Sequence, residues 1–289
     1  ADLGSGYFRG VAPAIALEPV ALGVFFALGI AAAVLGSLAP ALENARTPPA
    51  LPLKAGDEER AFARLQPVSP GLAMVALVIY GLVTGVCFAE KGHQVTCVDV
   101  DQAKGDSINN GVAPIYERGL GDLLKKHVGG RLRASTDLSG AVQQTDLSLI
   151  AVGTPFDGRE IDLTYIKAVS KEIGQALRNK PGYHVVIVKS TVVPGTTDDV
   201  VCPILEEASG KKAGIDFGVG MNPEFLTEGE AVKDCLFPDR IVLGGMDKAT
   251  IDQQARLYEG FPGVEVLHVN NKTAEMIKYT SNALLATLI

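Results

Sequence analysis

The sequence predicts an α/β fold, a doubly wound parallel sheet preceded by a separate hydrophobic helical segment. Three observations predict it. Residues 74–101 have the pattern of strand, helix and strand, and apolar strands alternate with helices from there to residue 289. The first 70 residues instead contain a long uncharged run followed by a charged, proline-rich stretch. We therefore expect an N-terminal segment over 1–70, a sheet domain over 71–269, and the start of a long helix over 270–289.

The N-terminal segment is hydrophobic enough to cross a membrane. Pro19–Leu42 carries no charge and exceeds the roughly 20 apolar residues that span a bilayer. Basic residues follow it, mixed with acids, and favour a cytoplasmic flank. Together with Pro40–Gly56, the run resembles the tail of an ABC-transporter permease, foreign to the sheet domain. We expect residues 19–42 to contact or enter a membrane; the alternative is a buried helix of a globular domain.

The sheet domain begins with a βαβ frame. Met74–Ile79 and His93–Asp101 are apolar strands on either side of a helix over Tyr80–Gly92. This frame is typical of a Rossmann-like domain that binds a dinucleotide such as NAD. Asp99, at the end of the second strand, is placed to accept hydrogen bonds from the ribose hydroxyls.

The turn of this frame has lost two glycines. A G-x-G-x-x-G turn lets backbone N–H groups approach the pyrophosphate. With Gly81 as the third glycine, the first two positions hold Ala76 and Val78. Because side chains there obstruct that approach, we predict weak NAD binding, and we attribute the altered turn to the nearby junction with the foreign segment.

The composition excludes several classes of function. The net charge of −7 argues against a nucleic-acid partner, which requires a basic face. The four cysteines form no C-x-x-C pair, and no His cluster has metal-ligand spacing, so we predict no metal site. Reduced thiols in the cytoplasm are the expected state of these cysteines.

Further strands and helices alternate after Asp101. The expected helices are a helix–loop–helix over Ser107–His127 and one helix over Ile161–Lys180; the expected strands lie in Thr145–Pro155, Tyr183–Thr197, Asp216–Glu230, Asp239–Gly245 and Val264–Val269.

Polar side chains follow three of these strands. They are Thr154, Thr191, Asn222 and Glu224. One Thr at a strand end is usually a turn or cap residue. Four polar residues at one edge favour a ligand site, because ligands bind outside the carboxyl ends of parallel strands.

The helix predicted over Asn270–Ile289 adds two candidates. Lys278 and Asn282 are four residues apart and share a helix face. In a helix without a functional role, both side chains would be exposed to solvent. Turned toward the strand ends, the lysine could stabilise a developing alkoxide.

These residues lie in motifs that resemble the UDP-glucose/GDP-mannose dehydrogenase family. The motifs extend from Met74 to the last residue: VDVD (Val98–Asp101), VGTP (Val152–Pro155), KSTVVPGTT (Lys189–Thr197), GVGMNPEFLTEGEAVKD (Gly218–Asp234), FPDRIVLGG (Phe237–Gly245) and EMIKYTSN (Glu275–Asn282). The resemblance implies NAD-dependent oxidation of the C6 alcohol of a nucleotide sugar to a carboxylate. UDP-glucose is the expected sugar nucleotide, with GDP-mannose and UDP-N-acetylmannosamine left open.

The resemblance also implies roles for single residues. On the cofactor side, the resemblance implies that Asp99 binds the ribose and that Lys104 is a nearby contact. It also implies that Thr154, Thr191 and Glu228 lie near the cofactor and that the Thr191 hydroxyl holds a water. On the substrate side, the resemblance implies Glu224 as general base in the thioester stage and the backbone of Phe225 and Leu226 as a sugar-nucleotide contact. It implies Lys278 with Asn282 as stabilisers of the alkoxide and of the later oxyanion.

One departure from the family pattern concerns the cysteine that carries the thioester intermediate. The family's catalytic cysteine belongs to a glycine-rich motif beyond Ile289, and Cys235 has no neighbouring base in sequence to activate it. We therefore expect incomplete oxidation of the sugar. The helix over 270–289 resembles the start of the family's central dimerisation helix, which implies a cytoplasmic homodimer.

Two other functions remain open at this stage. One is a membrane-tethered permease fragment that performs no chemistry. The other is a non-catalytic module that binds a pyridine nucleotide.

Overall fold

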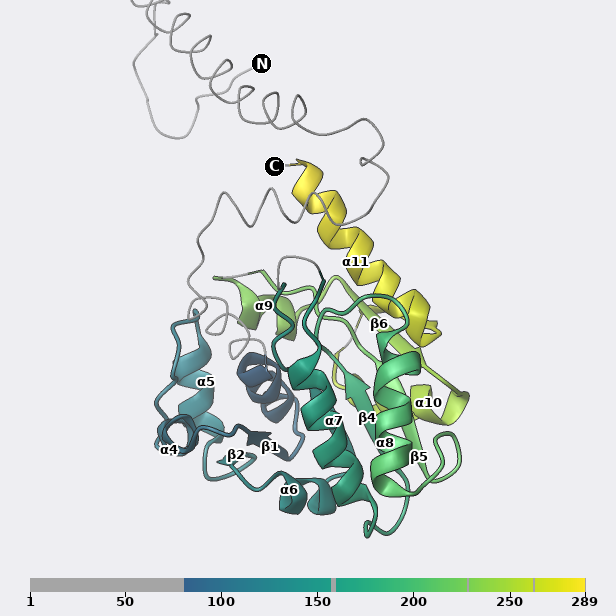
Figure 1. The fold of residues 1–289 in the computed structure, drawn as a ribbon. Helices are drawn as coiled ribbons and strands as arrows, with labels where there is room; N and C mark the ends of the chain where they lie inside the picture. Colours follow the sequence, from purple (N-terminus) through teal and green to yellow (C-terminus); the bar gives the residue numbers. More distant parts are fainter. Residues whose placement is uncertain (1–80, 157–159, 228, 262, 289) are drawn as a thin grey trace, which may run out of the picture. The chain divides into compact units, whose positions relative to one another are not determined.

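Seven strands form two sheets in the computed structural model, which describes residues 81–156, 160–227, 229–261 and 263–288 (Figure 1). Strands β1 (Val95–Val98) and β2 (Leu132–Ser135) form a parallel pair. The second sheet has the order β3-β4-β5-β6-β7. Its strands are β3 (Leu147–Ile150), β4 (His184–Val188), β5 (Phe217–Met221), β6 (Arg240–Gly245) and β7 (Glu265–Val269).

The five-stranded sheet is parallel except at one position. Strands β3, β4 and β5 are parallel, as the sequence predicts, whereas β6 runs antiparallel to β5. Among the described residues between β5 and β6, one helix is present, α9 (Ala231–Leu236). Its six residues rise about 9 Å, too little to return the chain along a strand of about 16 Å. The chain therefore enters β6 at the edge where β5 ends.

The expected helices are present with adjusted bounds. Residues 81–90 are helical, and the expected helix–loop–helix is observed as α4 (Gln102–Asn109) and α5 (Leu120–His127). The two later helices are α7 (Thr164–Leu177) and α11 (Asn271–Leu288). The carboxylate of Asp101 accepts a hydrogen bond from the Ala103 N–H and so begins α4 five residues before the expected start.

The sequence interpretation missed several short elements. They are β2, α6 (Leu138–Gln144), the π-helix η1 (Thr197–Val201), α8 (Cys202–Ser209), α9 and α10 (Lys248–Arg256). Strand β2 shows why: within its four residues only Leu132 is fully buried, so the apolar alternation that marks a strand is absent.

Strand β4 defines the two layers around the sheet. Its side chains alternate between two apolar clusters, with Val186 and Val188 facing α7 and α8, and Val185 and Ile187 facing Phe88 and the region after α10. Every residue of β4 and β5 is buried. Helices therefore cover both faces, which is the doubly wound arrangement.

Helix 81–90 packs against both sheets. A Cβ on Gly85 would lie 2.9 Å from Cys97 Sγ in β1, and a Cβ on Gly81 would lie 3.4 Å from Ala151 Cβ, just after β3. The first described residue of this helix, Gly81, therefore lies at the carboxyl end of β3.

Helix α11 packs closely on β6. A Cβ on Gly244 would lie 2.8 Å from Ala274 Cβ, so glycine at this position permits the close approach. The later turns of α11 extend away from the strands (Figure 1), where Leu284 and Leu285 are exposed.

Some expectations concern residues outside the described ranges. These are the hydrophobic segment 19–42, its permease-like flank, the strand over Met74–Ile79, and the turn with Ala76 and Val78. Within the described ranges, no helix combines the length and apolarity that a membrane crossing requires.

A buried histidine, His184, is the first residue of β4. His184 is fully buried; Nδ1 is 3.0 Å from the Thr145 carbonyl oxygen and Nε2 is 2.9 Å from Ser148 Oγ. The carbonyl accepts from Nδ1–H and the hydroxyl donates to Nε2, which suits the neutral ring. Burial lowers the pKa of His184 to about 4.

We predict that His184 makes the protein less stable in mild acid. The unfolded chain binds this proton near pH 6.5 and the folded chain near pH 4, so stability falls as pH falls between those values. The full effect is about 3 kcal/mol. Urea unfolding at pH 7 and pH 4.5 should show a smaller loss in His184→Gln than in the unaltered chain, and an unchanged loss in His268→Gln, whose side chain is exposed. Equal losses in all three would contradict the assignment.

Candidate functional site

The acid expected to bind ribose lies directly after β1. Asp99 Oδ1 accepts a hydrogen bond from the Asp101 N–H at 2.9 Å, and Oδ2 lies 3.6 Å from Lys104 Nζ in α4. The Asp99 side chain is 32% exposed, which leaves its oxygens accessible to a ligand. The structure thus brings together Asp99 and Lys104, the two residues implied for the adenosine side.

Two threonines meet where β3 and β4 end. Thr154 Oγ1 donates to the Thr191 carbonyl oxygen at 2.8 Å. Next to them, Ser190 Oγ donates to the Val152 carbonyl oxygen at 2.7 Å. These two hydrogen bonds join the loop after β3 to the loop after β4. The Thr191 hydroxyl takes part in neither of them.

A buried polar network lies at the ends of β4 and β5. Lys189 Nζ donates to Asn222 Oδ1 at 3.2 Å, and the Tyr258 hydroxyl donates to the same oxygen at 2.6 Å. Asn222 Nδ2 donates to the Val242 carbonyl oxygen at 2.9 Å. Burial lowers the pKa of Lys189, an effect that the charge of Glu224 opposes. The network therefore holds a positive charge in a dry environment.

Glu224 lies in the field of two lysines. Burial raises the pKa of Glu224, while the charges of Lys189 and Lys278 partly offset the rise. Burial likewise lowers the pKa of Lys278, and the carboxylate of Glu224 acts in the opposite direction. A carboxylate with a raised pKa is better matched to accept a proton near neutral pH.

Phe225 joins the substrate-side residues through its ring. Its centroid lies 4.5 Å from the Arg240 guanidinium carbon and 5.4 Å from Lys278 Nζ, so two cations border one ring. The next residue, Leu226, packs on the apolar cluster formed by helix 81–90 and α5. The loop after β5 is thus held between α11 and the β1–β2 part of the domain.

Two predicted site residues are not joined to the others. Asn282 is exposed on α11, and none of the described contacts links it to another site residue. Glu228 lies outside the described residues. Their implied roles stay predictions.

Cys235 has neighbours that its sequence context does not reveal. Contact with the Cys87 thiol, and then the charge of Lys189, lower the pKa of Cys235. The pKa of Cys87 is raised, first by its contact with Cys235 and then by burial, so the Cys87 thiol is not a base for Cys235. Both cysteines are free thiols. Within the described ranges, no group of three His, Cys, Asp or Glu residues could hold a metal ion.

Sequence analysis missed three residues of this site. Lys189, Arg240 and Tyr258 received no role. Lys189 could have been found, because a lysine directly after the buried run HVVIV must lie at the end of a sheet core. The positions of Arg240 and Tyr258 depend on the antiparallel β6 and on packing after α10, which no local pattern reveals.

The described residues fit a dinucleotide. A carboxylate follows β1, Gly81 of helix 81–90 adjoins the end of β3, and polar groups follow β3, β4 and β5. In NAD enzymes this edge binds the cofactor, with the acid on the ribose. The fold and site therefore define a dinucleotide-binding domain of the dehydrogenase type.

Comparisons with known proteins give the family. Residues 73–262 match the model of the UDP-glucose/GDP-mannose dehydrogenase family, NAD binding domain. GDP-mannose 6-dehydrogenase of Pseudomonas syringae pv. syringae is 46% identical over 220 residues, 75% of this chain and 50% of the relative. UDP-glucose 6-dehydrogenase of Haloferax volcanii is 43% identical over 75% of this chain and 52% of the relative.

A solved structure supports the same family. The chain aligns with GDP-mannose dehydrogenase from Pseudomonas aeruginosa, solved as a ternary complex, with a TM-score of 0.70 and 46% identity over 72% of this chain and 48% of that one. The chain belongs to the UDP-glucose/GDP-mannose dehydrogenase family and contains its NAD-binding domain. It spans about half the length of the curated relatives it matches.

We predict that Lys278 controls the proton affinity of Glu224. Replacing Lys278 with Met removes a nearby positive charge that lowers the pKa of Glu224, so this pKa should rise. A carbon-13 NMR titration of labelled glutamate carboxyls measures this, with Glu224→Gln identifying the signal.

Lys272→Met is the matched control for this titration. Lys272 is on the same helix but pairs with Asp199, so its removal should leave the Glu224 titration unchanged. An unaltered Glu224 in Lys278→Met, or an equal rise in both variants, would show that Lys278 does not act on Glu224.

Proposed function

We propose that the chain supplies the NAD-binding part of a nucleotide-sugar 6-dehydrogenase, which oxidises the C6 alcohol of the sugar. One observation carries the proposal: a half-buried carboxylate, Glu224, lies at the ends of parallel strands in the field of the buried Lys189 and the half-buried Lys278. Alcohol oxidation requires this combination of a proton acceptor and fixed positive charge.

The proposed roles follow the chemistry of the first oxidation. The C6 hydroxyl loses its proton to a base and its carbon loses a hydride to the nicotinamide that NAD supplies. Lys278 stabilises the negative charge that develops on oxygen, with Asn282 beside it on α11. We propose that Glu224 serves as the base of this first step, in addition to the thioester stage for which the family resemblance implies it. Thr191 holds a water.

The remaining roles concern binding. Asp99 binds the adenosine ribose, with Lys104 as its partner. Thr154 and Glu228 lie on the cofactor side, and the backbone of Phe225 and Leu226 contacts the sugar nucleotide. Homodimer formation through α11 is consistent with the exposure of Leu284 and Leu285.

We further propose that this copy binds NAD weakly. Ala76 and Val78 stand where the dinucleotide turn has glycine, and a Cβ at either position obstructs the approach of the pyrophosphate to backbone N–H groups.

Calorimetry with NAD tests the proposed function. The double variant Ala76→Gly/Val78→Gly should bind NAD at least about tenfold more tightly than the unaltered chain, since each 1.4 kcal/mol is a factor of ten. Adding Asp99→Ala to the double variant should remove that gain, because the ribose loses its acceptor. Equal NAD affinity with and without the two glycines would contradict the proposal that the altered turn weakens binding. An NAD affinity that Asp99→Ala leaves unchanged would contradict the assignment of Asp99 to the ribose.

The same titration separates the sugar nucleotides. Relatives named for GDP-mannose and for UDP-glucose match at 46% and 43% identity. We propose UDP-glucose from the motif similarity. Heat of binding with UDP-glucose and none with GDP-mannose, each in the presence of NAD, would support it; the reverse result would assign GDP-mannose.

A further inference from the structure

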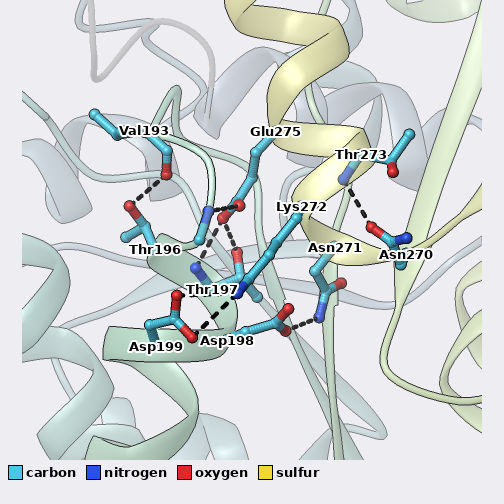
Figure 2. Close-up of polar contacts among 11 residues, drawn as sticks. Val193, Thr196, Thr197, Asp198, Asp199, Asn270, Asn271, Lys272, Thr273 and Glu275 are labelled. Atoms are coloured by element: carbon cyan, nitrogen blue, oxygen red, sulfur yellow. Dashed lines mark hydrogen bonds and ion pairs between the residues drawn. The ribbon is translucent and has the colours of Figure 1, made fainter.

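A fully buried carboxylate fastens α11 to the turn that follows β4. Glu275 has 0% exposure. Its Oε2 accepts from the Gly195 N–H at 2.5 Å, and its Oε1 accepts from the Thr197 N–H at 2.7 Å and from Thr197 Oγ1 at 2.6 Å. Figure 2 shows Glu275 reaching from α11 into this turn.

Two further contacts join the same elements. Asn271 Nδ2 donates to Asp198 Oδ1 at 2.7 Å, and Lys272 Nζ lies 3.1 Å from Asp199 Oδ2 (Figure 2). The Lys272–Asp199 pair is exposed, and such pairs contribute little. Glu275, with three hydrogen bonds, and the buried Asn271, with one, therefore supply most of the attachment of α11 to this turn.

The attachment connects the two parts of the candidate site. Thr191 lies four residues before Gly195, and Lys278 lies three residues after Glu275 on α11. Residues three apart on a helix are neighbours on its surface, so a fixed Glu275 leaves Lys278 little freedom to shift along or around the helix axis.

We propose that Glu275 is a positioning residue: by binding the turn at Gly195 and Thr197, it fixes Lys278 relative to Glu224 and the loop that carries Thr191. This rests on the function proposed above for Lys278. Glu275 contacts neither substrate nor cofactor in this proposal and acts only through α11.

The chemistry of the contact requires a carboxylate. Each of its two oxygens accepts a backbone N–H, and an ionised carboxylate is an acceptor at both atoms. Glutamine offers one oxygen and one NH₂ group, so in either orientation a donor would face a backbone N–H. The substitution Glu275→Gln therefore keeps the shape of the side chain but replaces one of its two accepting oxygens with a donor.

The test measures Lys278 directly and needs neither NAD nor turnover. The full chain is labelled briefly with acetic anhydride at a series of pH values, and mass spectrometry gives the pH of half-maximal labelling of Lys278. Burial holds the pKa of Lys278 below its ordinary value. In Glu275→Gln the midpoint should rise toward that value, with a faster labelling rate at high pH as the side chain becomes accessible. Thr197→Val, which removes one of the three hydrogen bonds, should give a smaller rise.

Glu206→Gln is the matched control. Glu206 is also a carboxylate that accepts a backbone N–H, from Ala213 at 3.1 Å, but its described contacts lie within the loop after α8. Its substitution should leave the Lys278 midpoint unchanged. The proposal is overturned if Glu275→Gln folds and leaves the midpoint unchanged, or if Glu206→Gln shifts it equally. Should Glu275→Gln fail to fold, an unchanged midpoint in Thr197→Val overturns it.

Discussion

The burial of β4 and β5 on both faces is the constraint on which the site depends. Every residue of these two strands is buried, and an uncompensated charge inside such a layer is strongly unfavourable. The first positions that can carry polar chemistry are therefore the residues that follow each strand. Lys189 and Asn222 occupy those positions and satisfy each other, so the edge of the sheet core is also where the first fixed charge of the site appears.

The rest of the site is arranged around that charge. Asn222 is bound by Tyr258 and by the Val242 carbonyl, so the loop after β5 leaves the sheet in a defined direction with Glu224 and Phe225 on it. Helix α11 adds a second lysine, Lys278, next to the Phe225 ring. The low polarity of the surroundings strengthens the attraction between these charges. It also raises the free-energy cost of holding them in the wrong positions. Function at this edge thus requires accurate placement of α11, which gives a reason for a buried carboxylate on its first turns.

The sequence predicts the parts that depend on local pattern and misses those that depend on distant partners. Apolar runs mark β3, β4 and β5, and the residues after them include Thr154 and Thr191, which are hydrogen-bonded in the structure. The direction of β6 follows from the shortness of α9, which its sequence alone does not disclose. The role of Glu275 depends on a turn 78 to 80 residues away, and that of Lys189 on a residue 33 positions away. Both look like ordinary charged residues until the fold brings their partners close.

The central claim is that this chain binds NAD at the carboxyl ends of its parallel strands. Nitrogen-15 NMR spectra of the full chain, recorded as NAD is added to millimolar concentration, test it most directly because weak binding still perturbs the residues in contact. We expect shifts at Asp99, Lys104 and Thr154 and none at His184, which lies at the opposite end of β4. Shifts centred on His184, or a spectrum that NAD leaves unchanged throughout, would contradict the account.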